Sequence, residues 1–206
     1  ETSTPASTAA RDTASRTAIA ASSSTVSSAR TAVAFATSGV TAMLALYLQA
    51  RFAFDETHTA WVFSLLGLTS SAIQLGLVHT LVTQFGEKRL SIAGILLLVV
   101  ALLGMAAAPT PVVLRGVLLF YAIGFAVIGP SALSLVSRAT VEREQGMVIG
   151  VVQSLGALAR VFGPMAAGIA LGRLGAGAPM VAGSIVCALA SVYMWYHLRP
   201  RSRAGE

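Results

Sequence analysis

The 206-residue sequence is poor in charged residues and in cysteine. Charged side chains make up 11% of it, whereas soluble domains carry about 25%. A chain in which 55% of the residues are apolar has too few polar side chains to cover a water-facing surface. The single cysteine, Cys187, excludes an internal disulfide, and no metal site or cofactor is indicated. The sequence therefore excludes an ordinary soluble domain and a disulfide-stapled fold.

The net charge of +6 does not indicate a nucleic-acid partner. The basic residues are scattered at the ends of apolar segments, and they form no patch with interleaved aromatic residues. We interpret them as signals of membrane topology, and no nucleic acid is expected to bind.

Apolar residues gather in six stretches that short polar segments separate. Each stretch is long enough for a helix to cross a hydrocarbon core of about 30 Å, which takes about 20 residues. The sequence therefore predicts an all-α membrane protein with six transmembrane helices and the lipid bilayer as its surroundings. The predicted spans are 31–50, 59–83, 90–108, 112–137, 147–171 and 178–198.

The two ends of the chain differ from the spans. Residues 1–30 are nearly all Ser, Thr and Ala, and this composition predicts a disordered cytoplasmic linker. Residues 199–206 form a basic cytoplasmic tail. Since the chain opens on Glu1 rather than Met, we expect a longer polypeptide to precede it.

The Lys and Arg residues sort unequally between the two sides of these spans, and cytoplasmic flanks hold the excess of such residues. One side has ten of them and the other has three, so both termini are expected in the cytoplasm and the protein in the cell membrane, as a multi-pass protein. The ten are Arg11, Arg16, Arg30, Lys88, Arg89, Arg138, Arg143, Arg199, Arg201 and Arg203; the three are Arg51, Arg115 and Arg173.

The exit of the second span, GLVHTLVTQFGEKRLSIAG (Gly76 to Gly94), resembles a signature of the major facilitator superfamily, approximately G-x-x-x-D-R-x-G-R-R. Gly86, Lys88 and Arg89 fit the end of this cytoplasmic loop motif. Thr83 stands where the aspartate belongs, and His79 where the first glycine belongs. Such erosion resembles the copy of the motif in the second half of these transporters.

The fifth span, GVVQSLGALARVFGPMAAG (Gly150 to Gly168), also resembles that family, particularly its drug and proton antiporter branch. The resemblance implies one half of a twelve-helix bundle, here its C-terminal six helices. It further implies transport of a small-molecule substrate by alternating access, with the site near the midplane between the halves. An N-terminal six-helix half of the same transporter is then the expected partner.

Arg160 is the one cation at bilayer depth, near the middle of the fifth span, where a charge costs roughly 2.5–3.5 kcal/mol on insertion scales. Gln153 and Gly156 precede it on the same helical face. Two interpretations stay open: Arg160 is a structural tie between helices, or it is a cavity cation that faces the substrate or an acid of the other half.

Other polar residues within the spans are further candidates for the substrate cavity, and some of them are expected to be interhelical hydrogen-bond partners instead. They are Tyr47, Gln49, Gln74, Tyr121 and Ser134. His79 is expected at the headgroup interface. Asp and Glu are absent from every predicted span, so an acid that couples transport to protons is expected in the other half.

Two Gly-Pro pairs interrupt predicted helices, Gly129–Pro130 in the fourth span and Gly163–Pro164 in the fifth. Proline removes a backbone hydrogen bond, and glycine lets another helix approach closely. Packing is one interpretation of these pairs, and a hinge used in alternating access is the other.

Two functions of other classes remain open at this point. A non-transporting six-helix scaffold is compatible with the spans. An intramembrane serine protease would use Ser131 beside Gly129 and Pro130, with His79 as its base, but the fuller Gly-x-Ser-Gly pattern is absent. The protein is therefore expected not to be an enzyme.

Overall fold

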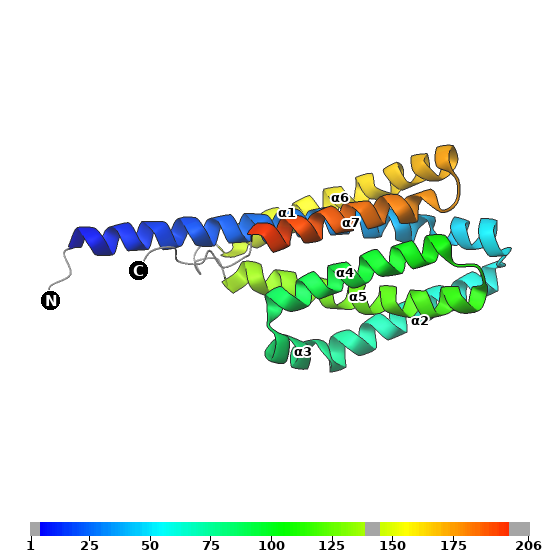
Figure 1. Cartoon of the computed structure of the whole chain (residues 1–206), viewed down its shortest axis with the longest axis horizontal. Helices are drawn as coiled ribbons and strands as arrows, with labels where there is room; N and C mark the ends of the chain where they lie inside the picture. The colour runs from blue at the N-terminus through cyan, green and yellow to red at the C-terminus, as the bar shows by residue number, and fades with distance from the viewer. Residues whose placement is uncertain (1–4, 139–144, 198–206) are drawn as a thin grey trace.

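The computed structural model describes residues 5–138 and 145–197, with side chains for residues 25, 27–128 and 146–197. This part of the chain is an all-helical bundle (Figure 1), so the predicted all-α fold is confirmed. Its helices are α1 (Pro5–Phe52), α2 (Glu56–Gly76), α3 (Val78–Phe85), α4 (Glu87–Ala107), α5 (Pro111–Arg138), α6 (Gln145–Leu174) and α7 (Ala178–His197).

Five of these helices are long and apolar enough to cross a membrane, and α2 with α3 makes a sixth span if the bent pair is counted as one. The spans are Ser27–Phe52, Glu87–Ala107, Pro111–Ile128, Gly146–Leu174 and Ala178–His197. At 1.5 Å per residue, a span of 20 residues is about 30 Å long, which matches the hydrocarbon core. The chain is therefore a multi-pass membrane protein.

The segment before residue 31 differs from the predicted disordered linker, because α1 begins at Pro5 and runs without a break to Phe52. Alanine has the highest helix propensity of all residues, and proline is favoured in the first turn. Once the span is helical, extending it needs no new nucleation step. The polarity of Ser and Thr favours disorder, but here the alanines between them and the adjoining span outweigh it. The tail 199–206 lies outside the described residues.

The predicted second span, 59–83, is bent by 53° between α2 and α3. The break falls at Leu77, whose N–H still donates to the Ile73 carbonyl at 2.9 Å. Gly86 then separates α3 from α4 with φ +78° and ψ 147°, a backbone conformation open essentially to glycine alone. Glycine is thus required at this turn of the loop motif.

The turn between α1 and α2 is closed by a capping carboxylate. Asp55 accepts a hydrogen bond from the His58 backbone N–H at 2.8 Å, which satisfies one of the free N–H groups at the start of α2. That bond, and then the bond with the His58 ring, holds the pKa of Asp55 below its usual value.

The core forms where α1 packs against α6 and α7, and α4 against α5 and α7. Large side chains from several helices are fully buried there, among them Leu44, Leu98, Leu118 and Met180, and Cys187 lies in the same core with no exposed surface. Because lipid is as apolar as these side chains, close packing rather than exclusion of water holds such helices together.

Glycines bring α1 and α6 into close contact. A Cβ built on Gly163 would lie 2.4 Å from the Phe35 carbonyl oxygen and 2.3 Å from the Ser38 hydroxyl, and one on Gly39 would lie 2.6 Å from the Gly163 oxygen. Only glycine lets the two backbones come this near. A larger residue at Gly163 would therefore push α1 and α6 apart.

Candidate functional site

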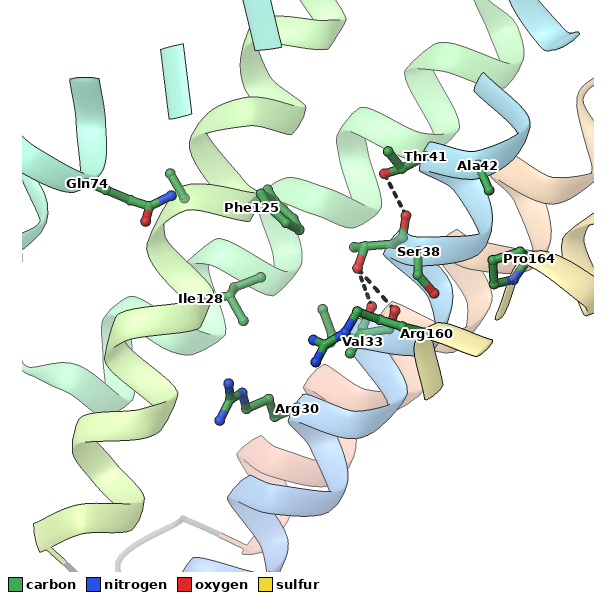
Figure 2. Close-up of a pocket in the computed structure, with 13 residues that line it drawn as sticks. Arg30, Val33, Ser38, Thr41, Ala42, Gln74, Phe125, Ile128, Arg160 and Pro164 are labelled. Atoms are coloured by element: carbon green, nitrogen blue, oxygen red, sulfur yellow. Dashed lines mark hydrogen bonds between the residues drawn. The ribbon is translucent and has the colours of Figure 1, made fainter. Parts of the chain in front are cut away.

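A cavity of about 620 Å³ opens between α1, α2, α5 and α6 (Figure 2). The lining residues from α1 recur every three or four positions, so they lie on one face of that helix. The lining residues are Arg30, Val33, Ala34, Thr37, Ser38, Thr41, Ala42, Gln74, Phe125, Ala126, Ile128, Arg160 and Pro164. Its wall is mostly apolar, with a few polar groups, as is usual for small-molecule sites.

The three hydroxyl groups on α1 already donate to backbone carbonyls. Thr37 Oγ1 donates to the Val33 oxygen at 2.8 Å, and Thr41 Oγ1 to the Thr37 oxygen at 2.8 Å. Ser38 Oγ lies 3.1 Å from the Phe35 oxygen and 3.4 Å from the Ala159 oxygen of α6. These hydroxyls can accept hydrogen bonds from a solute, but their protons are in use.

Tyr121 supports this wall from behind. Its side chain is 5% exposed, and its hydroxyl lies 3.2 Å from Thr41 Oγ1 and 3.4 Å from the Thr37 carbonyl oxygen that accepts from it. Its ring stacks on Phe125, with the centroids 6.2 Å apart and the planes 11° from parallel. Tyr121 therefore joins α5 to α1 and places Phe125 at the cavity.

Two arginines make the cavity positive. Figure 2 shows the guanidinium groups of Arg30 and Arg160, from α1 and α6, facing the same open space. The lining residues include no acid, and neither arginine forms an ion pair within the described part of the chain. Two cations of like charge in one cavity of a membrane protein favour a negatively charged occupant.

Gln153 lies next to this pair. Its Oε1 accepts a hydrogen bond from Arg30 Nη2 at 3.5 Å, which links α6 to α1. The second guanidinium nitrogen of Arg30, Nη1, is buried and has no hydrogen-bond partner among the described residues.

Some of the residues predicted from the sequence lie at the cavity, whereas Tyr47 and Gln49 do not. Arg160 and Gln74 line it, Gln153 contacts Arg30, and Tyr121 lies behind the lining residues, with its hydroxyl bonded to Thr41. Tyr47 is buried elsewhere, where its hydroxyl donates to the Met105 carbonyl of α4. Gln49 is exposed near the end of α1 and does not line the cavity.

The remaining predicted residues fall in three places. Pro164 lines the cavity. Gly86, Lys88 and Arg89 line a separate hollow of about 500 Å³ between α3 and α4. The side chains of Gly129, Pro130, Ser131 and Ser134 lie outside the described ones, so the structure does not place them.

Sequence reasoning missed Arg30, Thr37, Ser38, Thr41 and Phe125. From the sequence, Arg30 falls at the end of the segment predicted to be a linker, among the cytoplasmic cations. A signal for them existed, because Arg30, Thr37 and Thr41 recur at helical spacing in an otherwise apolar span. Within the described residues, no group of three His, Cys, Asp or Glu side chains could hold a metal.

Comparison with known proteins gives a family model and several similar proteins. A family model described as Major Facilitator Superfamily matches residues 26–206. The human major facilitator superfamily domain-containing protein 10 is 35% identical over 65% of this chain and 29% of its own length, and the mouse protein is 28% identical over 84% of this chain and 38% of its own length.

A solved structure agrees with these relatives. The crystal structure of the human organic anion transporter MFSD10 (TETRAN) superposes with a TM-score of 0.76 at 29% identity. The match covers 82% of this chain and 40% of the solved chain. The sequence thus spans well under half the length of the relatives that it matches.

Proposed function

Since the chain belongs to the major facilitator superfamily, we propose that it is the C-terminal six-helix half of a secondary transporter that moves a small organic anion by alternating access. The family assignment makes the protein a membrane transporter and not an enzyme, which excludes the intramembrane serine protease. The observation that carries the proposed substrate class is the cavity with Arg30 and Arg160, which no acid among the described residues lines. The human relative whose structure is solved is described as an organic anion transporter, which supports the same class.

Two observations support the half-transporter proposal: the chain matches well under half the length of its relatives, and most residues of α6 are not buried within the bundle. In the most apolar stretch of α6, 17% of the residues are buried within the bundle. The corresponding share is 44% in each of the spans in α1, α4, α5 and α7. Since α6 also lines the cavity, an N-terminal half that packs against it would close the cavity from the other side. That half is also where we place any acid that couples an antiport cycle to protons.

For orientation, we propose the cell membrane with both termini cytoplasmic, on the ten-to-three distribution of cations. A phosphatase reporter fused after Arg203 should be inactive in bacterial cells, and a fluorescent protein fused there should fold and fluoresce. An active phosphatase would reverse the orientation.

The transport proposal is tested with two probes that differ in charge, 2-naphthalenesulfonate and the neutral 2-naphthalenesulfonamide. The full-length transporter is reconstituted into liposomes, and uptake is measured against liposomes without protein. We expect uptake of the sulfonate to depend on the protein and to fall about 10- to 100-fold in Arg160→Gln, since a hydrogen bond to a charged group is worth about 1.5–3 kcal/mol.

Arg173→Gln removes the same charge from the exposed end of the same helix and is the matched control. It should transport like the wild type. Protein-dependent uptake of the sulfonamide but not of the sulfonate would refute an anionic substrate. A well-folded protein that carries no solute would instead favour the six-helix scaffold.

A further inference from the structure

The hydrogen bonding of Arg30 is incomplete: it has one weak bond, to Gln153, and one nitrogen without a partner among the described residues. The distance of 3.5 Å from Arg30 Nη2 to Gln153 Oε1 is at the outer limit for a hydrogen bond, where the interaction is weak. Arg30 Nη1 is buried and has no partner among the described residues. A buried donor without a partner is destabilising, and more so when the group is charged. This guanidinium therefore has capacity for a stronger acceptor.

Arg160 is directed toward the same place. Its Nη1 and Nη2 atoms lie 3.8 and 3.9 Å from the position that a Cβ on Gly156 would take, so the side chain folds back along α6 toward its N-terminal end. Gln153 lies in that direction, about two turns before Arg160. Figure 2 shows both guanidinium groups at one open space.

Few other donors compete for an anion in this cavity. The protons of Thr37, Ser38 and Thr41 are given to backbone carbonyls. Among the described residues, the lining groups that still have protons to donate are the two guanidinium groups and the amide of Gln74. An oxyanion bonds to a guanidinium at about 2.7–2.9 Å and about twice as strongly as a neutral acceptor, so it would displace the Gln153 amide oxygen.

We propose that Gln153 determines specificity by occupying, through Oε1, the place of one oxygen of the substrate's anionic group. On binding, the carboxylate or sulfonate replaces this oxygen and is shared by Arg30 and Arg160. The class of ligand is an organic anion with at least two oxygens on its charged group and an apolar or aromatic body, which lies against Phe125, Ala126 and Ile128. This inference rests on the proposed transport of an organic anion and names the residues that select it.

The test replaces the neutral oxygen with a charged one. In Gln153→Glu, a carboxylate attached to the protein competes for Arg30, so the Kd and KM for 2-naphthalenesulfonate should rise about tenfold or more at pH 7. Gln153→Leu removes the competing oxygen and should lower the Kd and KM roughly threefold. Arg30→Gln should weaken sulfonate binding about tenfold or more.

Opposite effects of two substitutions at one position separate this role from a structural one. In Gln153→Glu the carboxylate should stay ionised from about pH 5 to 8, because a free glutamate titrates near pH 4.3 and a neighbouring guanidinium lowers that pKa further. The KM of Gln153→Glu should therefore stay raised over this range, while that of Gln153→Leu stays lowered. Gln84→Glu adds the same charge at an exposed position of α3, away from the cavity, and should show no such change.

The outcomes distinguish this inference from the proposed function. A wild-type protein that binds the sulfonate without carrying it would refute the proposed transport, while weaker binding by Gln153→Glu would still support the role of Gln153. Transport of the sulfonate with an unchanged KM in Gln153→Glu would overturn the inference alone. A wild-type protein that neither binds nor carries the sulfonate would overturn both.

Discussion

At the scale of single residues, Tyr47 shows how a polar group within a membrane span can serve the fold alone. From the sequence it is a cavity candidate, because tyrosine can bind a solute. In the structure its side chain is 1% exposed, and its hydroxyl donates to the Met105 carbonyl at the end of α4. The hydrogen bond thus ties α1 to α4, away from the cavity.

Replacing Tyr47 by Phe removes this hydrogen bond and keeps the ring. We expect the free energy of unfolding of the purified full-length protein in detergent to fall by about 0.5–1.5 kcal/mol. The KM for 2-naphthalenesulfonate should not change. Tyr193→Phe, at an exposed position of α7, is the control and should leave both unchanged. A higher KM in Tyr47→Phe would indicate that Tyr47 contributes to substrate binding after all.

The spans were predictable from sequence, and the cavity was predictable only in part. Lipid requires each crossing segment to be a long apolar helix, and that requirement is visible in composition alone. Arg160 could be singled out because an isolated charge in a span is costly. Which face of α1 meets α6 depends on Gly39 and Gly163 approaching each other from opposite ends of the sequence. Local pattern shows the helical spacing of Arg30, Thr37 and Thr41, but it does not show that this face of α1 borders a cavity with α6.

At the scale of helices, the close approach of α1 and α6 gives a direct prediction. In Gly163→Ala the added methyl group would lie within 2.4 Å of the Phe35 carbonyl, so the helices must separate. We expect a loss of about 1–3 kcal/mol in the free energy of unfolding, measured by denaturation in detergent. Gly168→Ala is the matched control, since its Cβ would only reach ordinary contact with Met43 Sδ at 3.9 Å. Equal stability of the two variants would contradict this helix contact.

The bent α2–α3 pair offers a second matched comparison of glycines. Gly86 has the positive φ that disfavours any other residue, whereas Gly76 ends α2 with an ordinary backbone conformation and open space around its Cβ position. Gly86→Ala should cost about 1–3 kcal/mol of stability. Gly76→Ala should be neutral or should stabilise by up to about 1 kcal/mol. A reversed order in thermal unfolding would show that the turn at Gly86 is not as described.

At the scale of the whole molecule, we predict that this chain inserts into a membrane by itself but does not transport. Six helices supply one wall of a cavity that needs two, and its polar lining would then face lipid, which is unfavourable. Cells that express this chain alone should therefore show no uptake of 2-naphthalenesulfonate above background. Co-expression with a separate first half should restore part of it, because inserted helices can still associate.

The control for this experiment is the first half expressed alone, with membrane insertion of each piece checked by fractionation. Rapid uptake by this chain alone would contradict the half-transporter proposal and would point to a self-sufficient homodimer.

The burial of Cys187 makes this chain convenient for chemical labelling. With no exposed surface, its thiol is out of reach of water-soluble maleimides while the bundle stays folded. A cysteine introduced at an exposed site such as Gln153 would then be the one reactive thiol of this chain. Protection of that thiol by a solute would report occupancy of the cavity, and late labelling of Cys187 itself would report opening of the core.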